Sequence, residues 1–354
     1  MKLVDILTRA VEQDASDILL IPGLPASYKI SGVITREGDR LLPDALDALV
    51  REAYVLAGNR SMDRLERTGD DDFSFAVPRL SRFRVNALRQ RGSLALVIRV
   101  VSFSLPDRAS LGIPDSVMSF ASCSRGLVLF TGPAGSGKTT TLACIVDAIN
   151  STRNLHVITI EDPIEYLHHH KMSVVTQREL ATDTVSYDSA LRAALREAPD
   201  VILVGEMRDA ETIRAAVTAA ETGHLVISTL HTLGASNTID RIVDSFPPEQ
   251  QQQIRTQLAL VIEGVVSQQL VPAKDGTLVP AFEVMTVTPA VRNMIRESKA
   301  HQLDNVISSS AAEGMVSMDQ SLLQLVKAGR ISPDAALGHC VNGEWLRKRL
   351  AMNS

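Results

Sequence analysis

Several features that identify common classes of protein are scarce in this sequence of 354 residues. Its three cysteines, Cys123, Cys144 and Cys340, are too few and too far apart for a disulfide framework or a four-cysteine zinc site, so we expect a reducing, cytoplasmic compartment. No run approaches the roughly 18 apolar residues of a membrane span, and the acidic opening stretch does not resemble a signal peptide. We therefore expect any role at a membrane to depend on a partner.

Positive charge and aromatic side chains are also in short supply. The formal net charge is −5 and aromatic residues make up 4% of the chain. Motors that track nucleic acids combine basic grooves with stacking aromatic side chains, so a helicase is the weaker alternative and we expect no nucleic-acid partner. The apolar content of 45% is enough for a sizeable core, and the length favours two domains.

The spacing of apolar residues changes in character near residue 102. Before it, a helical pattern over residues 3–11 is followed by short apolar and alternating runs, which predict a small α+β domain over residues 1–101. Residues 102–113 contain Pro106 and Gly112 and predict a linker. Residues 114–354 predict an α/β domain with a parallel sheet.

The second domain has strands separated by helices, followed by a long C-terminal region. The strands are expected at Gly126–Thr131, His156–Ile160, Val201–Val204 and Leu225–Thr229. From Pro247 onward we expect mostly helices. One of these would have Ile254, Leu258, Val261 and Val265 on one face, and another would run over Ser317–Ala328.

One segment has the full pattern of a phosphate-binding loop. Residues 132–139 read GPAGSGKT between an apolar strand and a helix, an arrangement in which backbone N–H groups and the helix N-terminus surround a polyphosphate. We expect Lys138 to reach the β and γ phosphates, and Thr139 to bind Mg²⁺ through its hydroxyl. ATP is favoured because no guanine-reading element is apparent. The expected nucleotide contacts are Gly132, Pro133, Ala134, Gly135, Ser136, Gly137, Lys138, Thr139 and Thr140.

Carboxylates follow two of the other predicted strands. Glu206 ends the run VILVGE, and Glu165 lies in EDPIE after the strand at 156–160. Open α/β sheets bind ligands at the carboxyl ends of their strands, so we expect Glu206 on the metal side and Glu165 to orient the attacking water, with the reverse assignment open. Gly205 stands where P-loop ATPases commonly have an aspartate.

Histidines mark two further places. His231 ends the strand at 225–229 and is a candidate sensor of the γ phosphate, and His224, just before that strand, is a second catalytic candidate. An ordinary polar role is the alternative for each. The run His168–His170 is interpreted as a solvated loop, because three adjacent side chains do not easily converge on one metal ion.

Four segments in this order, GPAGSGKT, ITIEDPIEY, VILVGEMRD and TGHLVISTLHT, resemble the Walker A, Asp box, Walker B and His box of the type II/IV secretion and pilus ATPase superfamily. A glycine at the position of Gly205 is usual in that superfamily. Residues 289–297, PAVRNMIRE, resemble the AIRNLIRE motif of PilT-type retraction ATPases. The family's SDLHL reads SDILL at residues 16–20, and the tetracysteine site of assembly-type relatives is missing.

This resemblance implies a PAS-like N-terminal domain and a RecA-like ATPase domain with C-terminal helices, assembled as a homohexamer. It implies Mg²⁺-dependent ATP hydrolysis that powers pilus retraction at the inner face of the cytoplasmic membrane. The implied partners are an inner-membrane platform protein and a sister pilus ATPase. Arg82 and Arg84 are nominated to act on a neighbouring subunit's nucleotide, with Arg208 and Arg214 as additional candidates. An accessory PilU-like motor, an assembly ATPase and a non-catalytic partner subunit are the alternatives.

Overall fold

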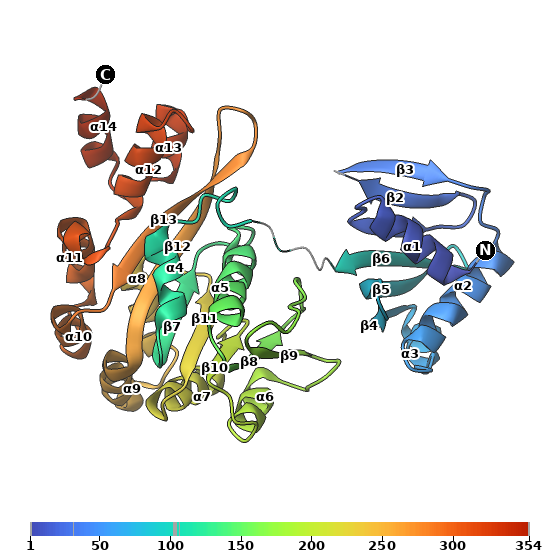
Figure 1. The fold of residues 1–354 in the computed structure, drawn as a ribbon, viewed down its shortest axis with the longest axis horizontal. Helices are drawn as coiled ribbons and strands as arrows, with labels where there is room; N and C mark the ends of the chain where they lie inside the picture. The colour runs from blue at the N-terminus through green and yellow to red at the C-terminus, as the bar shows by residue number, and fades with distance from the viewer. Residues whose placement is uncertain (1, 31, 102–104, 106, 353–354) are drawn as a thin grey trace. The chain divides into compact units, whose positions relative to one another are not determined.

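The chain divides into two compact units in the computed structural model (Figure 1). The structure describes residues 2–30, 32–101, 105 and 107–352. One unit comprises residues 1–104 and the other the rest of the chain, with residues 165–167 grouped with the first. Of the predicted linker, residues 102–104 and 106 lie outside the described part.

The N-terminal unit is a six-stranded antiparallel sheet with helices packed against it. The order of strands across the sheet is β3-β2-β1-β6-β5-β4. The strands are β1 Asp17–Leu20, β2 Ala26–Ile30, β3 Val33–Glu37, β4 Asp70–Val77, β5 Ser81–Gln90 and β6 Ser93–Val101. The helices are α1 Leu3–Glu12, α2 Pro43–Leu56 and α3 Asp63–Thr68.

The core of this unit follows from two periodicities. Leu3, Ile6, Leu7 and Ala10 share one face of α1, and all four are buried. In β5, burial alternates along the strand, so that Phe83 and Val85 face the core while Arg82 and Arg84 lie on the other face. The predicted α+β character of this region is confirmed.

The C-terminal unit is built on a seven-stranded sheet in the order β13-β12-β7-β11-β10-β8-β9. Neighbouring strands are parallel, except that β12 and β13 form an antiparallel pair at one edge. The strands are β7 Gly126–Thr131, β8 His156–Glu161, β9 Val174–Glu179, β10 Val201–Val204, β11 Leu225–Leu230, β12 Ile262–Pro272 and β13 Leu278–Thr286. The predicted α/β domain with a parallel sheet is confirmed.

Helices surround this sheet and continue to the C-terminus. The α-helices are α4 Asp115–Met118, α5 Lys138–Thr152, α6 Tyr187–Ala194, α7 Ala210–Glu221, α8 Ala235–Asp244, α9 Pro248–Val261, α10 Pro289–Arg296, α11 Leu303–Ser309, α12 Met318–Lys327, α13 Pro333–His339 and α14 Gly343–Ala351. Short 3-10 turns are η1 Ser119–Ser122, η2 Ala300–Gln302 and η3 Ala311–Glu313. No helix in the described part of the chain has the length and apolar character needed to cross a membrane.

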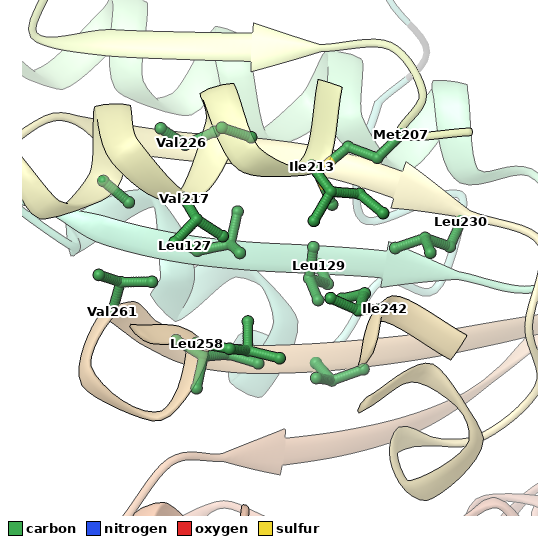
Figure 2. Close-up of a cluster of buried hydrophobic side chains, with 14 of the residues drawn as sticks. Leu127, Leu129, Met207, Ile213, Val217, Val226, Leu230, Ile242, Leu258 and Val261 are labelled. Atoms are coloured by element: carbon green, nitrogen blue, oxygen red, sulfur yellow. The ribbon is translucent and has the colours of Figure 1, made fainter. Parts of the chain in front are cut away.

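Strand β7 lies inside the sheet, between β12 and β11, and is buried along its whole length. Its side chains alternate between two cores: Leu127 and Leu129 join one, and Val128 and Phe130 join the other. Figure 2 shows side chains of β7 and β11 facing those of α7, α8 and α9. Truncating such a leucine to alanine costs about 2–5 kcal/mol of folding stability. Because β7 is buried on both faces, the loop that follows it begins from a rigid strand.

The segment 262–286 corrects the expectation of a mostly helical region after Pro247. Helix α9 ends at Val261, and Val265, which the helical spacing places on its apolar face, lies in β12. The β12–β13 hairpin extends the sheet beside β7, where Val265 and Val266 face opposite cores. A run of β-branched residues that is buried on both faces satisfies a helical pattern and a strand equally well, which explains the error. The helix expected over 317–328 is confirmed as α12.

Candidate active site

The motifs singled out in the sequence meet at the carboxyl edge of the parallel sheet. Strand β11 lies between β7 and β10, and β8 lies on the far side of β10. In the parallel register Thr131 pairs with Leu230, and Val204 pairs with both Ser228 and Ile160. The loops after these four strands therefore leave the sheet side by side, as in other open α/β ligand sites.

The loop between β7 and α5 needs glycine at two positions. Gly132 has φ +139°, and a Cβ there would lie 2.2 Å from the backbone oxygen of Gln268 in β12. Gly137 has φ +85°, and a Cβ there would lie 2.9 Å from Nε2 of the same Gln268. Both positions combine a conformation that only glycine adopts easily with no room for a side chain. Gln268 of β12 therefore packs directly against both glycines of the loop.

Two buried hydroxyls in this loop region have no hydrogen-bond partner among the described residues. They are Oγ1 of Thr131, at the end of β7, and Oγ of Ser136. The two residues are 0% and 3% exposed, so water does not easily satisfy them. Buried polar groups are nearly always paired, and a phosphate-bearing ligand in the loop would supply the missing acceptors.

Lys138 is the first residue of α5 and folds back on its own loop. Its Nζ donates hydrogen bonds to the carbonyl oxygens of Gly132 at 2.7 Å and Pro133 at 2.9 Å. Burial lowers the pKa of Lys138, and the negative charge of Glu206 acts in the opposite direction. The two predicted Walker side chains therefore lie close enough for their charges to interact.

Glu206 is the centre of a short polar chain after β10. Its Oε2 pairs with Nη2 of Arg208 at 2.8 Å, and its Oε1 pairs with Nε2 of His231 at 2.9 Å. Burial favours the neutral carboxyl, but the hydrogen bond from Arg208 and the charges of His231 and Arg208 outweigh it, so the pKa of Glu206 is lowered. The structure thus brings the predicted metal-side carboxylate and the predicted sensor into direct contact.

Gly205 lacks a side chain for a physical reason. A Cβ at this position would lie 2.9 Å from the hydroxyl of Tyr187 and 3.1 Å from the carbonyl oxygen of Ile160. The backbone of Gly205 is held by two hydrogen bonds. Its N–H donates to the carbonyl oxygen of Ile160 at 2.8 Å, and its carbonyl oxygen accepts from the Thr229 hydroxyl at 2.6 Å. The aspartate found here in many P-loop ATPases would not fit this structure.

The acidic segment after β8 is held in part by neighbouring strands. Oε1 of Glu161 accepts hydrogen bonds from Thr159 at 2.6 Å and from Gln177 at 3.1 Å, which fixes its direction. Glu165 is exposed and belongs to residues 165–167, which group with the N-terminal unit. Its role in orienting water stays a prediction.

His224 does not lie with the other predicted site residues. It stands at the amino end of β11, where its backbone oxygen accepts from Gly126 at the start of β7. Its Nδ1 contacts the carbonyl oxygen of Ala219 at 2.9 Å and the hydroxyl of Thr222 at 3.1 Å. The six residues of β11 separate it from His231, a span of about 20 Å at the rise of a strand. The structure therefore does not support a catalytic His224 within one chain.

The histidine run is only partly solvated. Burial lowers the pKa of the His168 imidazole to about 4, whereas His169 and His170 are exposed. Nδ1 of His170 accepts a hydrogen bond from the backbone of Val175 at 3.1 Å. Among the described residues no group of three or more His, Cys, Asp or Glu is arranged to hold a metal ion.

Two arginines named as additional candidates have different surroundings. Arg208 pairs with Glu206, as described above. Arg214 lies over the ring of Phe246 at 5.1 Å and donates to Gln250 at 2.7 Å, so the structure gives it an ordinary packing role between α7 and the region of α8 and α9. In the N-terminal unit, Arg82 donates to the hydroxyl of Ser74 at 2.9 Å.

A cavity of about 220 Å³ beside the P-loop was not anticipated from the sequence. It is bounded on one side by Gly137, Thr140 and Thr141 of the loop and helix α5. Apolar side chains from the segment before α4 and from β12 and β13 complete it, with one arginine: Leu111, Ile113, Leu270, Leu278, Val279 and Arg330. An apolar slot with a few polar groups next to a phosphate loop suits the base and sugar of a nucleotide.

The segment 289–297 forms helix α10, and one arginine ties it to the core. Arg292 donates to the backbone oxygens of Ala259 and Leu260 at the end of α9, both at 2.9 Å. It also pairs with Glu263 of β12 at 2.8 Å. Helix α10 is therefore fixed to α9 and to β12, the strand that pairs with the P-loop strand β7.

The oxygen donors near the loop fit a hard divalent cation. Thr139 follows Lys138 in the first turn of α5, and Glu206 lies after the end of β10, where its charge acts on Lys138. A hydroxyl, a carboxylate and phosphate oxygens form the ligand set that Mg²⁺ prefers when it keeps part of its water shell.

Comparisons with known proteins agree with this geometry. A family model described as "Type II/IV secretion system protein" matches residues 1–299. "Type IV pilus retractation ATPase PilT" of Pseudomonas aeruginosa is 43% identical over 337 residues, covering 95% of this chain and 97% of that protein. "Twitching motility protein" of Neisseria gonorrhoeae is 49% identical over 274 residues, covering 77% of this chain and 73% of that protein.

A solved structure has the same fold over nearly the whole chain. "Crystal Structure of the Pilus Retraction Motor PilT and Bound ADP" superposes with a TM-score of 0.88 at 44% identity, covering 98% of this chain and 99% of that one. The predicted arrangement of an N-terminal domain followed by a RecA-like ATPase domain is confirmed. The chain belongs to the type II/IV secretion system protein family, within its PilT-like group of ATPases.

Proposed function

We propose that this chain is a motor subunit that hydrolyses ATP and powers the retraction of a type IV pilus. The observation that carries the proposal is the meeting of three groups at one sheet edge: Lys138 in the P-loop, Glu206 after β10 and His231 after β11. A phosphate cradle, a carboxylate and a polar donor are what phosphoryl transfer from ATP needs, since its catalysis consists mainly of positioning and charge stabilisation.

The roles of the side chains follow from their positions. Lys138 would exchange the carbonyl oxygens of Gly132 and Pro133 for the β and γ phosphates. Thr139 and Glu206 would hold Mg²⁺, whose chemistry is to neutralise charge on the phosphate oxygens. Glu165 would orient the water that attacks the γ phosphorus, while the bond to the ADP oxygen breaks.

His231 is suited to report whether the γ phosphate is present. Its Nε2 bonds Glu206 at 2.9 Å, and its side chain is 52% exposed, so it is free to turn toward a ligand. With ATP bound, a phosphate oxygen would compete with Glu206 for this nitrogen. Hydrolysis would return His231 to Glu206, and the loop before α8 would move with it.

The base and sugar of ATP would occupy the cavity of about 220 Å³ beside Thr140 and Thr141. Its apolar lining would cover the faces of the base, while the hydroxyls and Arg330 would face the sugar and the α phosphate. This assignment explains why the segment before α4 reaches the P-loop helix.

Work by the motor would require several subunits. We propose a homohexamer in which Arg82 and Arg84 of one subunit act on the nucleotide of its neighbour, because both arginines share the face of β5 turned away from the core. The force would reach the pilus through an inner-membrane platform protein at the cytoplasmic face of the membrane. A sister pilus ATPase is a further proposed partner, and an accessory PilU-like role is the second candidate function.

The first experiment is ATP hydrolysis by the purified chain and its Lys138→Ala variant. We expect turnover to fall by at least about 100-fold, because charge stabilisation at the phosphates is lost. The fold should persist, since within the described residues the hydrogen bonds of Lys138 Nζ go to carbonyl oxygens of its own loop. Lys171→Ala is the matched control, because Lys171 pairs with Asp147 on the surface of the same unit. Unchanged turnover in Lys138→Ala would overturn the proposed ATPase mechanism.

The cellular role is tested by deleting the gene in its host. Cells that keep their pili but do not retract them or twitch would match the retraction motor. Loss of pili would favour assembly. Retraction that persists with reduced force would favour the accessory role, and stimulation of the purified ATPase by DNA would favour a nucleic-acid motor.

A further inference from the structure

Tyr187 is close to the catalytic edge, yet no sequence motif includes it. It is the first residue of α6, whose N-terminus is capped by Ser186 accepting from the backbone of Ser189. Its ring packs against the core that lies under β8 and β10. Its hydroxyl stands 2.9 Å from the place where a Cβ of Gly205 would be. The tyrosine therefore fills the space that the missing side chain leaves between the Asp box and the Walker B strand.

The surroundings of this hydroxyl are mostly acidic. Burial is the main effect that raises the pKa of Tyr187, and the charges of Asp162, Glu206 and Glu161 raise it further, against an opposing effect of Arg208. The phenol is therefore neutral at physiological pH and keeps its proton. A neutral O–H group can donate to a carboxylate or to a water molecule without adding negative charge to the cluster.

We propose that Tyr187 is a positioning residue of the ATPase site, whose hydroxyl orients the carboxylate of Glu206 and the water beside it. This inference rests on the proposed ATPase function. In P-loop ATPases with an aspartate before the Walker B glutamate, that carboxylate organises the water around Mg²⁺. Here the space at position 205 is closed by the tyrosine, which offers one oxygen at the same strand tip. The phenol can donate its proton to a carboxylate while its oxygen accepts from a water molecule, so it can take over part of this positioning.

The direct test is Tyr187→Phe, which keeps the ring in the core and removes only the hydroxyl. We expect kcat for ATP to fall about tenfold while KM stays within twofold, as is typical when an interaction acts mainly in the transition state. ADP binding is measured with and without Mg²⁺. Affinity without Mg²⁺ should be unchanged, and the gain in affinity on adding Mg²⁺ should shrink at least threefold.

Tyr28→Phe is the matched control, because Tyr28 is a buried tyrosine of the other unit and lies in β2. It should match the unaltered chain in both measurements. A Tyr187→Phe variant with normal kcat and a normal Mg²⁺-dependent gain would overturn the inference, while leaving the ATPase function intact. A chain that binds MgADP but hydrolyses no ATP in any form would instead refute the proposed function, and the Mg²⁺ measurement would still test Tyr187.

A second experiment asks whether the hydroxyl really occupies the space next to Gly205. Gly205→Ala places a methyl group 2.9 Å from the tyrosine oxygen, so we expect a lower thermal unfolding temperature. In the Tyr187→Phe background the nearest contact is gone, and the Ile160 carbonyl at 3.1 Å and the Cα of Glu161 at 3.4 Å remain. The loss of unfolding temperature should then be clearly smaller. Equal losses in the two backgrounds would show that the hydroxyl is held elsewhere and would overturn the inference.

Discussion

The hydroxyl of Thr141 donates a hydrogen bond to Oε1 of Gln268 at 2.9 Å, and this contact joins the P-loop helix to strand β12. The two residues are 127 positions apart in the chain. The backbone oxygen and Nε2 of the same glutamine lie where side chains at Gly132 and Gly137 would be. One buried residue thus supports the loop and its helix, through its backbone at Gly132 and through its side chain at Gly137 and Thr141.

Replacing Gln268 by alanine should weaken nucleotide binding without unfolding the chain. The change leaves the Thr141 hydroxyl without its partner and opens space under the loop, a loss of about 1–2 kcal/mol and so about 5- to 30-fold in affinity. Titration of ADP into the two proteins measures it. Gln269→Ala is the control, because Gln269 bonds the carbonyl oxygen of His339 instead of the P-loop helix. Equal ADP affinities for the Gln268→Ala and unaltered chains would contradict the supporting role.

Local chemistry explains which parts of the site the sequence could predict. Gly132, Lys138 and Thr139 lie within one loop whose spacing has few other uses, and Glu206 ends a short apolar run. The parallel sheet then brings the strand ends together, because strands separated by helices cross over in one direction. The contact between Glu206 and His231 follows from that topology.

The remaining features depend on segments that are distant in sequence. Gln268 lies in a hairpin that resembled a helix, since its apolar residues are buried on both faces. The cavity beside α5 is lined from five separate segments, and only the P-loop segment among them has a recognisable pattern. His224 shows the opposite case: it is near His231 in sequence, but a six-residue strand puts it at the other end of the sheet, a separation that sequence distance does not reveal.

The stability of the N-terminal unit should depend on acid pH through Asp71. This residue is fully buried, and it accepts hydrogen bonds from Arg60 at 2.9 and 3.0 Å and from Tyr54 at 3.0 Å. Burial raises its pKa, but the bonds from Arg60 and Tyr54 outweigh this, so the pKa is lowered from 3.8. Such a group stabilises the fold at pH values above 3.8, and its contribution is lost as pH falls through the lowered pKa.

Asp71→Asn should therefore destabilise this unit at neutral pH by about 2–3 kcal/mol, because Arg60 loses its charged partner. This loss of stability should vanish in strong acid, because Asp71 of the unaltered chain is then protonated and neutral, like asparagine. Hydrogen exchange of amides in β4 and β5 of the full chain, followed against pH, measures the effect. Asp72→Asn is the control, since the neighbouring Asp72 is exposed. If the difference in amide exchange between Asp71→Asn and Asp72→Asn did not change with pH, the proposed role of the charged Asp71 would be refuted.

Leu270→Ala should separate recognition of the base from recognition of the phosphates. Leu270 lines the cavity beside the P-loop, and its Cδ2 is 3.8 Å from the place of a Gly137 Cβ. Losing its apolar contact should weaken ADP binding about fivefold, at about 1 kcal/mol. Pyrophosphate, which has no base, should bind with unchanged affinity. Leu260→Ala is the control, because Leu260 is 60% exposed and lies outside the cavity. An equal loss for ADP and pyrophosphate would place the base elsewhere.

Glu206→Gln should stop hydrolysis while leaving nucleotide binding in the absence of Mg²⁺ nearly intact. The amide keeps the size of the side chain and can still accept from Arg208 or His231, so the loops should hold their places. It cannot supply the negative charge that the metal side of the site needs, and we expect turnover to fall by about 100-fold or more.

Single-turnover hydrolysis and ADP titration distinguish the two effects. The matched control is Glu211→Gln, which removes an exposed carboxylate from the first turn of α7. Turnover within twofold of the unaltered chain would mean that Glu206 serves mainly to hold Arg208 and His231, and the metal role would then pass to another carboxylate of the sheet edge. A variant that loses ADP binding as well as turnover would show that the pair with Arg208 maintains the loop after β10. Retained binding with lost turnover is the expected result, because the P-loop cradle is built from β7, α5 and β12 and does not need Glu206 to form.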